Sequence, residues 1–450
     1  MVKELIQNLI RPGSRIEFES VPAPAMAVGG RGIAALALPM SWGPEDELIP
    51  LLSTDLSTGA AKGKIGYSAS ASQSLLFKEC LKYCYKLFAW RSDRSGIKAE
   101  ATIGELTITA LYTGVRGNDI IVAIKKLVDE SYVVSTFVDN ILEDEQAVQM
   151  ASELKANAWC TFSGEGDLTT TPSAGVPLTG GANGVINQGT YDGYFKALSF
   201  ERWQTMGIID DAPEVPELVS MFVINQIDTQ GRKVQGVVYN SVAANHDGII
   251  GLKQGYETES GSIVEPYKAV ALAVGVSAGT AMNQSATNML INGAVAIINE
   301  LEHEEIEKAL LEGWLLFTRR TDGSIKIEQD INTFREFVPT KGKEYRKNRV
   351  IRTLGEINNT VKQTWETFYE GKCNNNLADR NSFKGDLIAY FKQLQALNCI
   401  TNFDPEIDLV VERGLEIDAV VVYAWIQPID SMEKLYMKVF TDVLERRAAT

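Results

Sequence analysis

Few side chains in this chain are suited to acid–base or nucleophilic chemistry, because only two of its 450 residues are histidines. His246 lies in the turn-like segment Ala243–Gly248, and His303 lies on an acidic helical segment, Glu302–Glu305. His303 has no second histidine one helical turn away, as the helix motif of zinc enzymes requires. We therefore predict a solvated helix face at His303 and no catalytic site at either histidine.

Serine and glycine motifs lead to the same prediction. The segment Gly275–Met282 superficially resembles a serine-protease loop, but hydroxyl groups beside glycine are common in turns. Gly59–Lys64 is a basic glycine turn whose spacing differs from that of a phosphate-binding loop. Acidic pairs such as Asp210–Asp211 are expected by chance in so acidic a chain. We predict no catalytic, cofactor-binding or metal-binding residues.

The composition is that of a soluble globular protein with more than one domain. Hydrophobic residues make up 45% of the chain and charged residues 22%, and 450 residues exceed what one core usually organises. The net charge of −15 disfavours general nucleic-acid binding, and no run of about 18 apolar residues predicts a membrane span. The five cysteines, with Cys80 and Cys84 one helical turn apart, are interpreted as reduced thiols of a protein made in the cytoplasm.

The N-terminal segment is predicted to be an arm. After the turn signal Arg11–Ser14, the apolar residues Ile16 and Phe18 alternate with charged neighbours, as in a half-buried strand. The segment Val21–Ala25 contains two prolines and predicts a stiff, non-helical spacer. A lone strand cannot pair its own backbone groups, so we expect Ile16 and Phe18 to contact another subunit.

The middle of the chain predicts a β-rich insertion followed by alternating helices and strands. Residues 72–90 show helical spacing of apolar residues, and residues 97–185 are rich in Thr, Ile and Val and predict an inserted β domain. From residue 190 onward, helical and strand patterns alternate, which indicates a mainly parallel sheet with helices on its faces. Trp314–Thr318 and Ile325–Ile327 predict a hairpin.

The C-terminal hundred residues predict two amphipathic helices, over about 344–370 and around Phe383–Leu397, and a strand-rich stretch over 408–427. Beyond the proline-containing segment Gln427–Ser431 comes a second β-prone arm. The residues of this arm that we expect to contact other subunits are Leu435, Tyr436, Met437, Val439 and Phe440.

Several short stretches, in order over nearly the whole chain, carry a family resemblance. They are Gly29–Leu36 followed by Trp42–Pro44, Gly114–Ile120, Leu178–Gly181, Phe317–Gly323, Glu328–Thr333, Lys347–Arg352 and Gln427–Tyr436. Each is weakly specific alone, but their shared order makes a chance match improbable. On these stretches the chain resembles the tail sheath proteins of contractile phages, in particular the short form of Gram-positive phages and phage-tail-like bacteriocins.

The resemblance implies a fold, which we state as an expectation. Family members have an α/β core that is subtilisin-like in fold and non-catalytic, an inserted β-sandwich, a C-terminal α+β domain and extended terminal arms. The expected parts of this chain are the N-terminal arm (1–25), the first part of the core (26–96), the inserted β-sandwich domain (97–185), the α/β core (186–340), the C-terminal sheath domain (341–430) and the C-terminal arm (431–450).

The resemblance also implies a structural function without cofactors. Family subunits stack as six-fold rings around an inner tube, join neighbours by strand exchange between arms, and contract to drive the tube through a target cell envelope. The expected partners are further copies of the chain, the inner tail tube protein, and baseplate and tail terminator proteins, with no nucleic acid and no membrane insertion. We expect assembly in the bacterial host cytoplasm and a place in a virion tail or phage-tail-like particle.

One basic segment stands out on this acidic chain. Residues 341–352, the basic segment, carry six cations against one acid, Glu344. One interpretation is a solvated helix face, and the other is docking on an acidic inner tube or on the acidic helix of a neighbouring subunit. The cations are Lys341, Lys343, Arg346, Lys347, Arg349 and Arg352, and the acidic helix holds Glu300, Glu302, Glu304, Glu305 and Glu307.

Two other functions remain open from the sequence. One is a soluble oligomeric binding module whose arms only join copies of the chain, and the other is a hydrolase on an α/β core. Electron microscopy of the purified protein separates them from a sheath, which forms rings, tubes or contracted cylinders.

Overall fold

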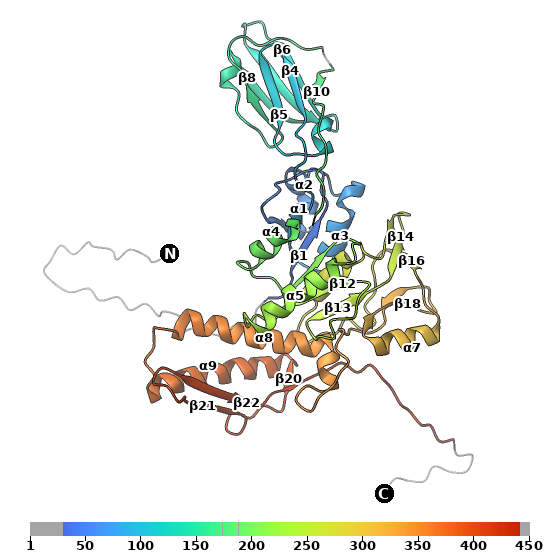
Figure 1. The fold of residues 1–450 in the computed structure, drawn as a ribbon, viewed down its shortest axis with the longest axis vertical. Helices are drawn as coiled ribbons and strands as arrows, with labels where there is room; N and C mark the ends of the chain where they lie inside the picture. The colour runs from blue at the N-terminus through green and yellow to red at the C-terminus, as the bar shows by residue number, and fades with distance from the viewer. Residues whose placement is uncertain (1–29, 173, 188, 442–450) are drawn as a thin grey trace, which may run out of the picture. The chain divides into compact units, whose positions relative to one another are not determined.

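Two compact units make up the described part of the chain in the computed structural model, which covers residues 30–441 apart from residues 173 and 188 (Figure 1). The larger unit comprises Gly30–Glu356 together with the described residues from Ile429 onward, and the smaller unit comprises Ile357–Pro428. Among the helices of these residues, none is long and apolar enough to cross a membrane.

A seven-stranded sheet forms the centre of the larger unit, in the order β17-β13-β12-β11-β1-β3-β2. Every neighbouring pair is parallel except β2 with β3 at one edge, so the expected mainly parallel sheet is present. The strands are β1 (Ile33–Leu38), β2 (Ile49–Leu52), β3 (Lys86–Arg91), β11 (Thr205–Ile208), β12 (Gln235–Tyr239), β13 (Ile249–Leu252) and β17 (Trp314–Leu315).

Helices cover both faces of this sheet, which explains its continuous apolar strands. In β1, Leu36 faces a cluster with α3 (Leu75–Leu81) and α6 (Val270–Gly279). Its neighbour Ala35 faces a second cluster, with α4 (Gly189–Leu198) and α5 (Val215–Asp228). The helical patterns predicted from residue 190 onward include α4, α5 and α6.

The helix predicted over residues 72–90 is wrong in its second half. A 3-10 turn, Ser72–Ser74, leads into α3, which ends at Leu81, and Lys86–Arg91 is strand β3 at the interior of the sheet. Because β3 is buried on both faces, its apolar run Leu87–Trp90 has no alternation that would separate it from a helix.

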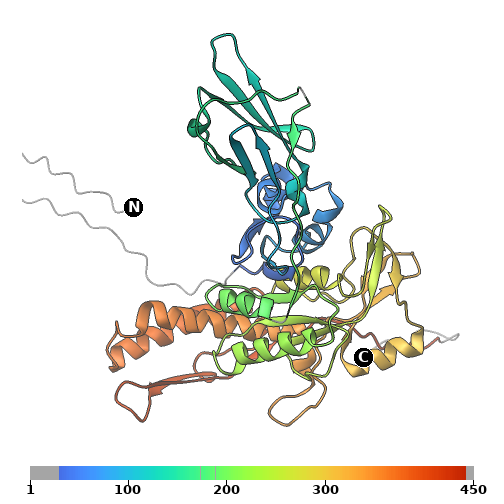
Figure 2. The ribbon, with the colours of Figure 1, turned by 45° about the horizontal axis from the view of Figure 1, so that its top comes forward.

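A β-sandwich is inserted between β3 and α4, as predicted (Figure 2, teal). Alternate residues of its strands point inward, and Leu106, Ile108 and Ala110 are buried in its apolar cluster. Trp42, from the loop after β1, joins the same cluster. One sheet holds β4 (Glu100–Ile103), β5 (Leu106–Ala110) and β9 (Cys160–Ser163), and the other β6 (Ile120–Lys126), β7 (Tyr132–Val138), β8 (Ile141–Val148) and β10 (Val176–Pro177).

The predicted hairpin is confirmed from Phe317 onward, but not for Trp314–Leu315. β18 (Phe317–Arg319) pairs antiparallel with β19 (Ile325–Ile327), whereas Trp314–Leu315 belongs to the main sheet as β17. The chain therefore changes sheet at Leu316. The remaining elements are α1 (Ser53–Thr58), α2 (Ala61–Ile65), β14 (Gly255–Thr258), β15 (Ile263–Val264), β16 (Ala294–Ile298) and α7 (His303–Glu312).

The predicted C-terminal helices and strands are present, and most of their residues lie in the smaller unit. Helix α8 (Asn348–Thr364) begins in the larger unit and continues into the smaller one. Helix α9 (Leu377–Ala396) buries an apolar face that includes Phe383, Leu387 and Leu394. The strand-rich stretch is a hairpin of β21 (Leu409–Arg413) and β22 (Val420–Ala424), beside the short pair β20 (Ile400–Thr401) and β23 (Gln427–Pro428).

Candidate functional site

The serine of the segment Gly275–Met282 lies inside α6 and not on an exposed turn. Gly275–Gly279 has the Gly-x-Ser-x-Gly spacing, which in hydrolases places the serine on a sharp strand-to-helix turn. Here the buried Ser277 hydroxyl donates a hydrogen bond to Gln235 Oε1 (3.0 Å) and lies 2.9 Å from the Thr205 hydroxyl. Ser277 is therefore a core residue with satisfied hydrogen bonds.

Neither histidine lies in an arrangement suited to catalysis. His246 Nδ1 accepts a hydrogen bond from the Gly248 backbone N–H (2.9 Å), and the His246 backbone exchanges hydrogen bonds with the Thr333 hydroxyl. Burial lowers the pKa of His246, and Asp247 offsets this only in part, so the ring is neutral at neutral pH. His303 is 87% exposed on α7, as predicted.

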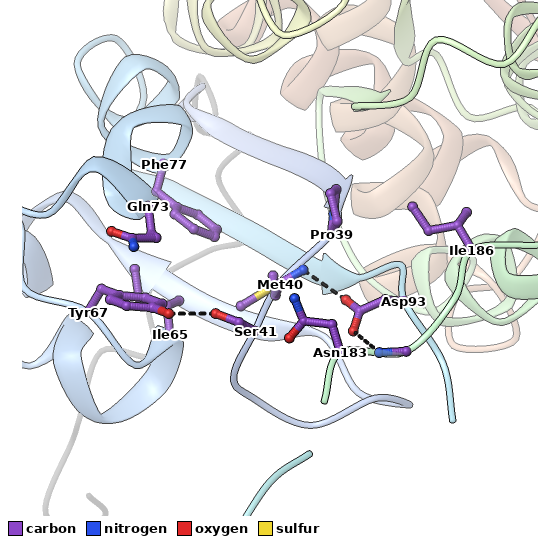
Figure 3. Close-up of a pocket in the computed structure, with 11 residues that line it drawn as sticks. Pro39, Met40, Ser41, Ile65, Tyr67, Gln73, Phe77, Asp93, Asn183 and Ile186 are labelled. Carbon is purple, nitrogen blue, oxygen red and sulfur yellow. Dashed lines mark hydrogen bonds between the residues drawn. The ribbon is translucent and has the colours of Figure 1, made fainter. Parts of the chain in front are cut away.

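A pocket of about 330 Å³ opens where β1 and β3 end, at the edge where α/β sheets commonly bind ligands (Figure 3). Asp93 lines it, but both carboxylate oxygens are engaged. Oδ1 accepts from the Met40 N–H (2.8 Å), and Oδ2 accepts from Arg91 Nη2 (2.6 Å) and the Gly184 N–H (3.2 Å). Asp93 therefore ties loops together. In the described part of the chain, no three or more His, Cys, Asp or Glu side chains are grouped to hold a metal ion.

The C-terminal arm is extended and exposed. Residues 435–441 form no strand with any described residue, so the predicted β-prone arm is coil in the single subunit. All five predicted contact residues are apolar and project into solvent, where they contribute no burial energy. Their exposed fractions are 85% for Leu435, 88% for Tyr436, 74% for Met437, 69% for Val439 and 80% for Phe440. Ile16 and Phe18 of the N-terminal arm lie outside the described residues.

Glu433 fixes the start of this arm to the larger unit. Its side chain is 9% exposed and forms an ion pair with Lys347. Its carboxylate also accepts hydrogen bonds from Gln329 Nε2 (3.0 Å), Thr287 Oγ1 (2.8 Å) and Ser431 Oγ (3.0 Å). Burial opposes ionisation, but these hydrogen bonds and Lys347 outweigh it and lower the pKa of Glu433. The carboxylate is therefore charged at neutral pH.

Half of the basic segment is neutralised within the same subunit. Lys341 Nζ lies 2.9 Å from the Asp247 carboxylate. Arg352 is fully buried, and its Nη2 lies 2.6 Å from Asp330 Oδ2. Like Lys347, these two cations have acidic partners that are distant in sequence.

Arg346 and Lys343 have different surroundings. Arg346 is half-buried, and both burial and the neighbouring Arg335 guanidinium lower the pKa of Arg346. Its Nε and Nη2 have no hydrogen-bond partner among residues 30–441, excluding 173 and 188. Lys343 is exposed, whereas Arg349 is 7% exposed. The two Arg346 donors without partners are buried beside a second cation, whereas Lys343 is the exposed cation of the segment that is open to an external carboxylate.

Four family profiles match consecutive parts of the chain. They are described as the tail sheath protein Gp18 domain III N-terminal region (residues 31–91), the phage tail sheath protein beta-sandwich domain (94–183), the phage tail sheath protein central domain (184–333) and the phage tail sheath C-terminal domain (340–441). The second profile coincides with the inserted sandwich.

Individual proteins resemble the chain over nearly its full length. It is 31% identical to the phage-like element PBSX protein XkdK of Bacillus subtilis, over 95% of this chain and 97% of that protein. The crystal structure of the sheath tail protein from Desulfitobacterium hafniense matches with a TM-score of 0.83 and 36% identity, over 95% of this chain and 99% of that chain. The contracted helical sheath of the anti-feeding prophage, at 9% identity and a TM-score of 0.58 over 96% of this chain and 99% of that chain, shares the fold.

Proposed function

From the premise that this chain belongs to the phage tail sheath protein family, and is a contractile tail sheath subunit of a phage or phage-like injection system, we propose that its terminal arms join neighbouring subunits. The protein is structural and not an enzyme. The proposed assembly is a stack of six-fold rings around an inner tube, which contracts to drive the tube through a cell envelope.

The exposed C-terminal arm is the observation that carries the joining role. It combines unpaired backbone groups with apolar side chains on both faces of an extended segment. Strand addition to a neighbour would form roughly four to six backbone hydrogen bonds at about 0.5–1.5 kcal/mol net each. Burial would add about 1.5–3 kcal/mol for each fully covered apolar side chain. One arm thus supplies several kcal/mol to each junction.

The hairpin β21–β22 is a suitable acceptor for a neighbour's arm. No third strand pairs with it among the described residues, so it offers open edges. Val422, Tyr423 and Trp425, at or beside β22, are 38%, 51% and 59% exposed. A two-stranded hairpin is marginally stable alone and gains from an added strand. We propose that the arm of one subunit extends this hairpin in the next.

The test impairs strand addition by the arm without changing the folded subunit. Met437→Pro eliminates a backbone donor, Phe440→Ala removes an exposed ring, and Phe200→Ala, which removes another ring that is 82% exposed, is the control. Negative-stain electron microscopy should show rings or cylinders for the wild type and the control only. All four proteins should melt within a few degrees of one another. Normal cylinders from Met437→Pro, or a large fall in its melting temperature, would refute the joining role.

We also propose that Arg346 and Lys343 dock on an acidic surface of the inner tube or of a neighbouring subunit. The exposure of Lys343 and the partial exposure of Arg346 support this. Arg346→Glu should reduce assembly most at low salt, because the charge of a side chain that is only half-buried is screened as salt rises. Lys98→Glu, an exposed lysine of the inserted sandwich, is the control. A salt series that does not distinguish Arg346→Glu from the control would favour a merely solvated segment.

The finer features implied by the resemblance form part of the same proposal. The parallel sheet covered by helices on both faces, with Ser277 buried, supports a subtilisin-like core that retains a fold without its chemistry. The proposed partners are further copies of the chain, the inner tail tube protein, and the baseplate and tail terminator proteins. The proposed place of assembly is the bacterial host cytoplasm.

A further inference from the structure

The two places where the terminal arms begin both contact helix α8 or the residue before it. We propose that Arg31 and Glu433 are positioning residues that anchor the N-terminal root (residues 30–32) and the C-terminal root (residues 429–433) to α8 and Lys347. This inference rests on the proposed joining role of the arms, and it adds where on the subunit each arm is fixed.

Glu433 is the residue that holds the C-terminal root, since its side chain is buried whereas the residues on either side of it are exposed. Met432 is 104% exposed and Lys434 is also exposed, whereas the Glu433 side chain is 9% exposed. An ionised carboxylate buried to this extent is stable only with charged and hydrogen-bonding partners. Lys347 and Gln329 supply two of them from the larger unit. The arm therefore becomes free only beyond Glu433.

The N-terminal root is held in the same way through Arg31. Its Nη1 lies 2.9 Å from Glu356 Oε1 on α8, and these side chains are 7% and 2% exposed. Its Nη2 and Nε donate to the Ser277 (3.0 Å) and Thr280 (3.2 Å) carbonyl oxygens, where the helix dipole of α6 favours a cation. Burial lowers the pKa of Arg31 to about 10, with Glu356 opposing the shift, so the guanidinium is charged at neutral pH.

Helix α8 connects the two anchors. Lys347 and Glu356 are separated by about 14 Å at the helical rise per residue. Between them, Arg352 holds α8 to the core through Asp330. A helix is stiff over this length, so tension on one arm is transmitted to the other root along α8 as well as through the contacts of Arg31 and Glu433 with the core. The geometry thus assigns α8 the role of a tie between the two arms of one subunit.

The first experiment measures release of the C-terminal root in the unassembled full-length subunit. Trypsin cleavage after Lys434 requires the adjacent Glu433 to leave its site, whereas cleavage after Lys438 in the exposed arm does not. Lys347→Ala, which leaves the arm sequence unchanged, should accelerate cleavage after Lys434 about tenfold, since it removes a charge-assisted hydrogen bond. Cleavage after Lys438, followed by mass spectrometry, should be unaffected.

Lys98→Ala is the matched control, because this lysine is exposed and belongs to the inserted sandwich. Trypsin should cleave this variant after Lys434 and after Lys438 at the wild-type rates. Equal cleavage after Lys434 in Lys347→Ala and wild type would overturn the C-terminal anchor. For the N-terminal root, Glu356→Gln should accelerate cleavage after Arg31 by a similar factor, and an unchanged rate would overturn that anchor.

The second experiment tests whether the anchors serve assembly. Lys347→Glu should abolish long cylinders, and the exchange Lys347→Glu/Glu433→Lys should restore them, because it re-forms the ion pair with reversed charges. Long cylinders from Lys347→Glu alone would overturn the positioning role even if cleavage were accelerated. Failure of the anchors is distinguishable from failure of the joining role, because the joining role is refuted by the Met437→Pro variant and not by these measurements.

Discussion

At the residue scale, buried charge pairs organise the region around α8. Asp330 Oδ2 accepts from Arg352 Nη2 (2.6 Å) and the Ala286 N–H (2.9 Å), and Oδ1 accepts from Asn348 Nδ2 (2.9 Å). Burial opposes ionisation of Asp330, but Arg352 and the hydrogen bonds outweigh it and lower the pKa of Asp330. A buried pair of this kind contributes mainly by the cost of breaking it.

Asp330→Asn should destabilise the subunit by about 3–5 kcal/mol at pH 7, because it leaves Arg352 buried without its counter-charge. The pKa of Asp330 is lowered by folding, so its contribution is present above the unfolded value of about 3.9 and is lost as the pH falls through the folded value. Denaturant unfolding at pH 7 and at pH 3 should therefore show a smaller difference between variant and wild type at pH 3. Asp418→Asn, an exposed carboxylate, is the control.

At the scale of elements, glycines set the distance between α3 and α6. A Cβ at Gly275 would lie 2.3 Å from the Cys80 carbonyl oxygen, and one at Gly279 would lie 1.7 Å from the Tyr83 carbonyl oxygen. Both neighbours are backbone atoms and cannot move as a side chain would. The two helices thus pack closely on one face of the sheet only because these positions lack side chains.

Gly275→Ala should lower the melting temperature, with a cost of about 1–3 kcal/mol from overpacking that exceeds the helix-propensity gain. Gly385→Ala is the matched control, since Gly385 lies inside α9 with nothing within 4 Å of an added Cβ. It should stabilise its helix by about 0.5–1 kcal/mol. Calorimetry distinguishes a lowered melting temperature for Gly275→Ala from a raised one for Gly385→Ala. Equal changes in the two variants would contradict the packing argument.

At the scale of the whole molecule, the inserted sandwich contacts the core through buried side chains as well as through its two connections. Arg116 of the insertion donates to the Gly66 carbonyl oxygen (2.7 Å), and Arg91 of the core donates to the Thr113 carbonyl oxygen (2.9 Å). Its two connections run side by side, with paired hydrogen bonds between Ile97 and Ala182 (2.9 and 3.1 Å). Trp42 of the core enters the sandwich cluster, with its ring centroid 5.0 Å from that of Trp159 and 5.3 Å from that of Tyr112. The insertion can therefore be deleted where its two connections lie side by side, but its deletion exposes Trp42.

Replacing residues 97–185 with a short Gly/Ser linker should leave a folded subunit that still forms rings, because the connections are adjacent where the insertion begins and ends. The exposed Trp42 should increase binding of a hydrophobic dye, and adding Trp42→Ser should reverse this increase. Size-exclusion chromatography and electron microscopy check both variants. Loss of all folded protein in both would show that the insertion is part of the core.

The sequence alone determined the features that depend on local patterns and on unpaired segments. The Thr-, Ile- and Val-rich composition of residues 97–185 identified the inserted β domain, and the regular succession of helices and strands after residue 190 identified the parallel sheet. The ordered motifs identified the family, and the lone β-prone segment behind Pro428 identified an exposed arm. These properties depend on period, composition and order along the chain.

Only the tertiary structure decided which charges and which apolar runs meet. Lys347 finds Glu433 and Arg352 finds Asp330 across long stretches of chain, so a segment that is basic in sequence is half neutralised in space. Lys86–Arg91 became a strand because β1 and β2 flank it in the sheet and helices cover both of its faces, a property that local spacing does not encode. Pairing and burial are set by distant neighbours, which is why the anchors of the arms emerged only from the folded chain.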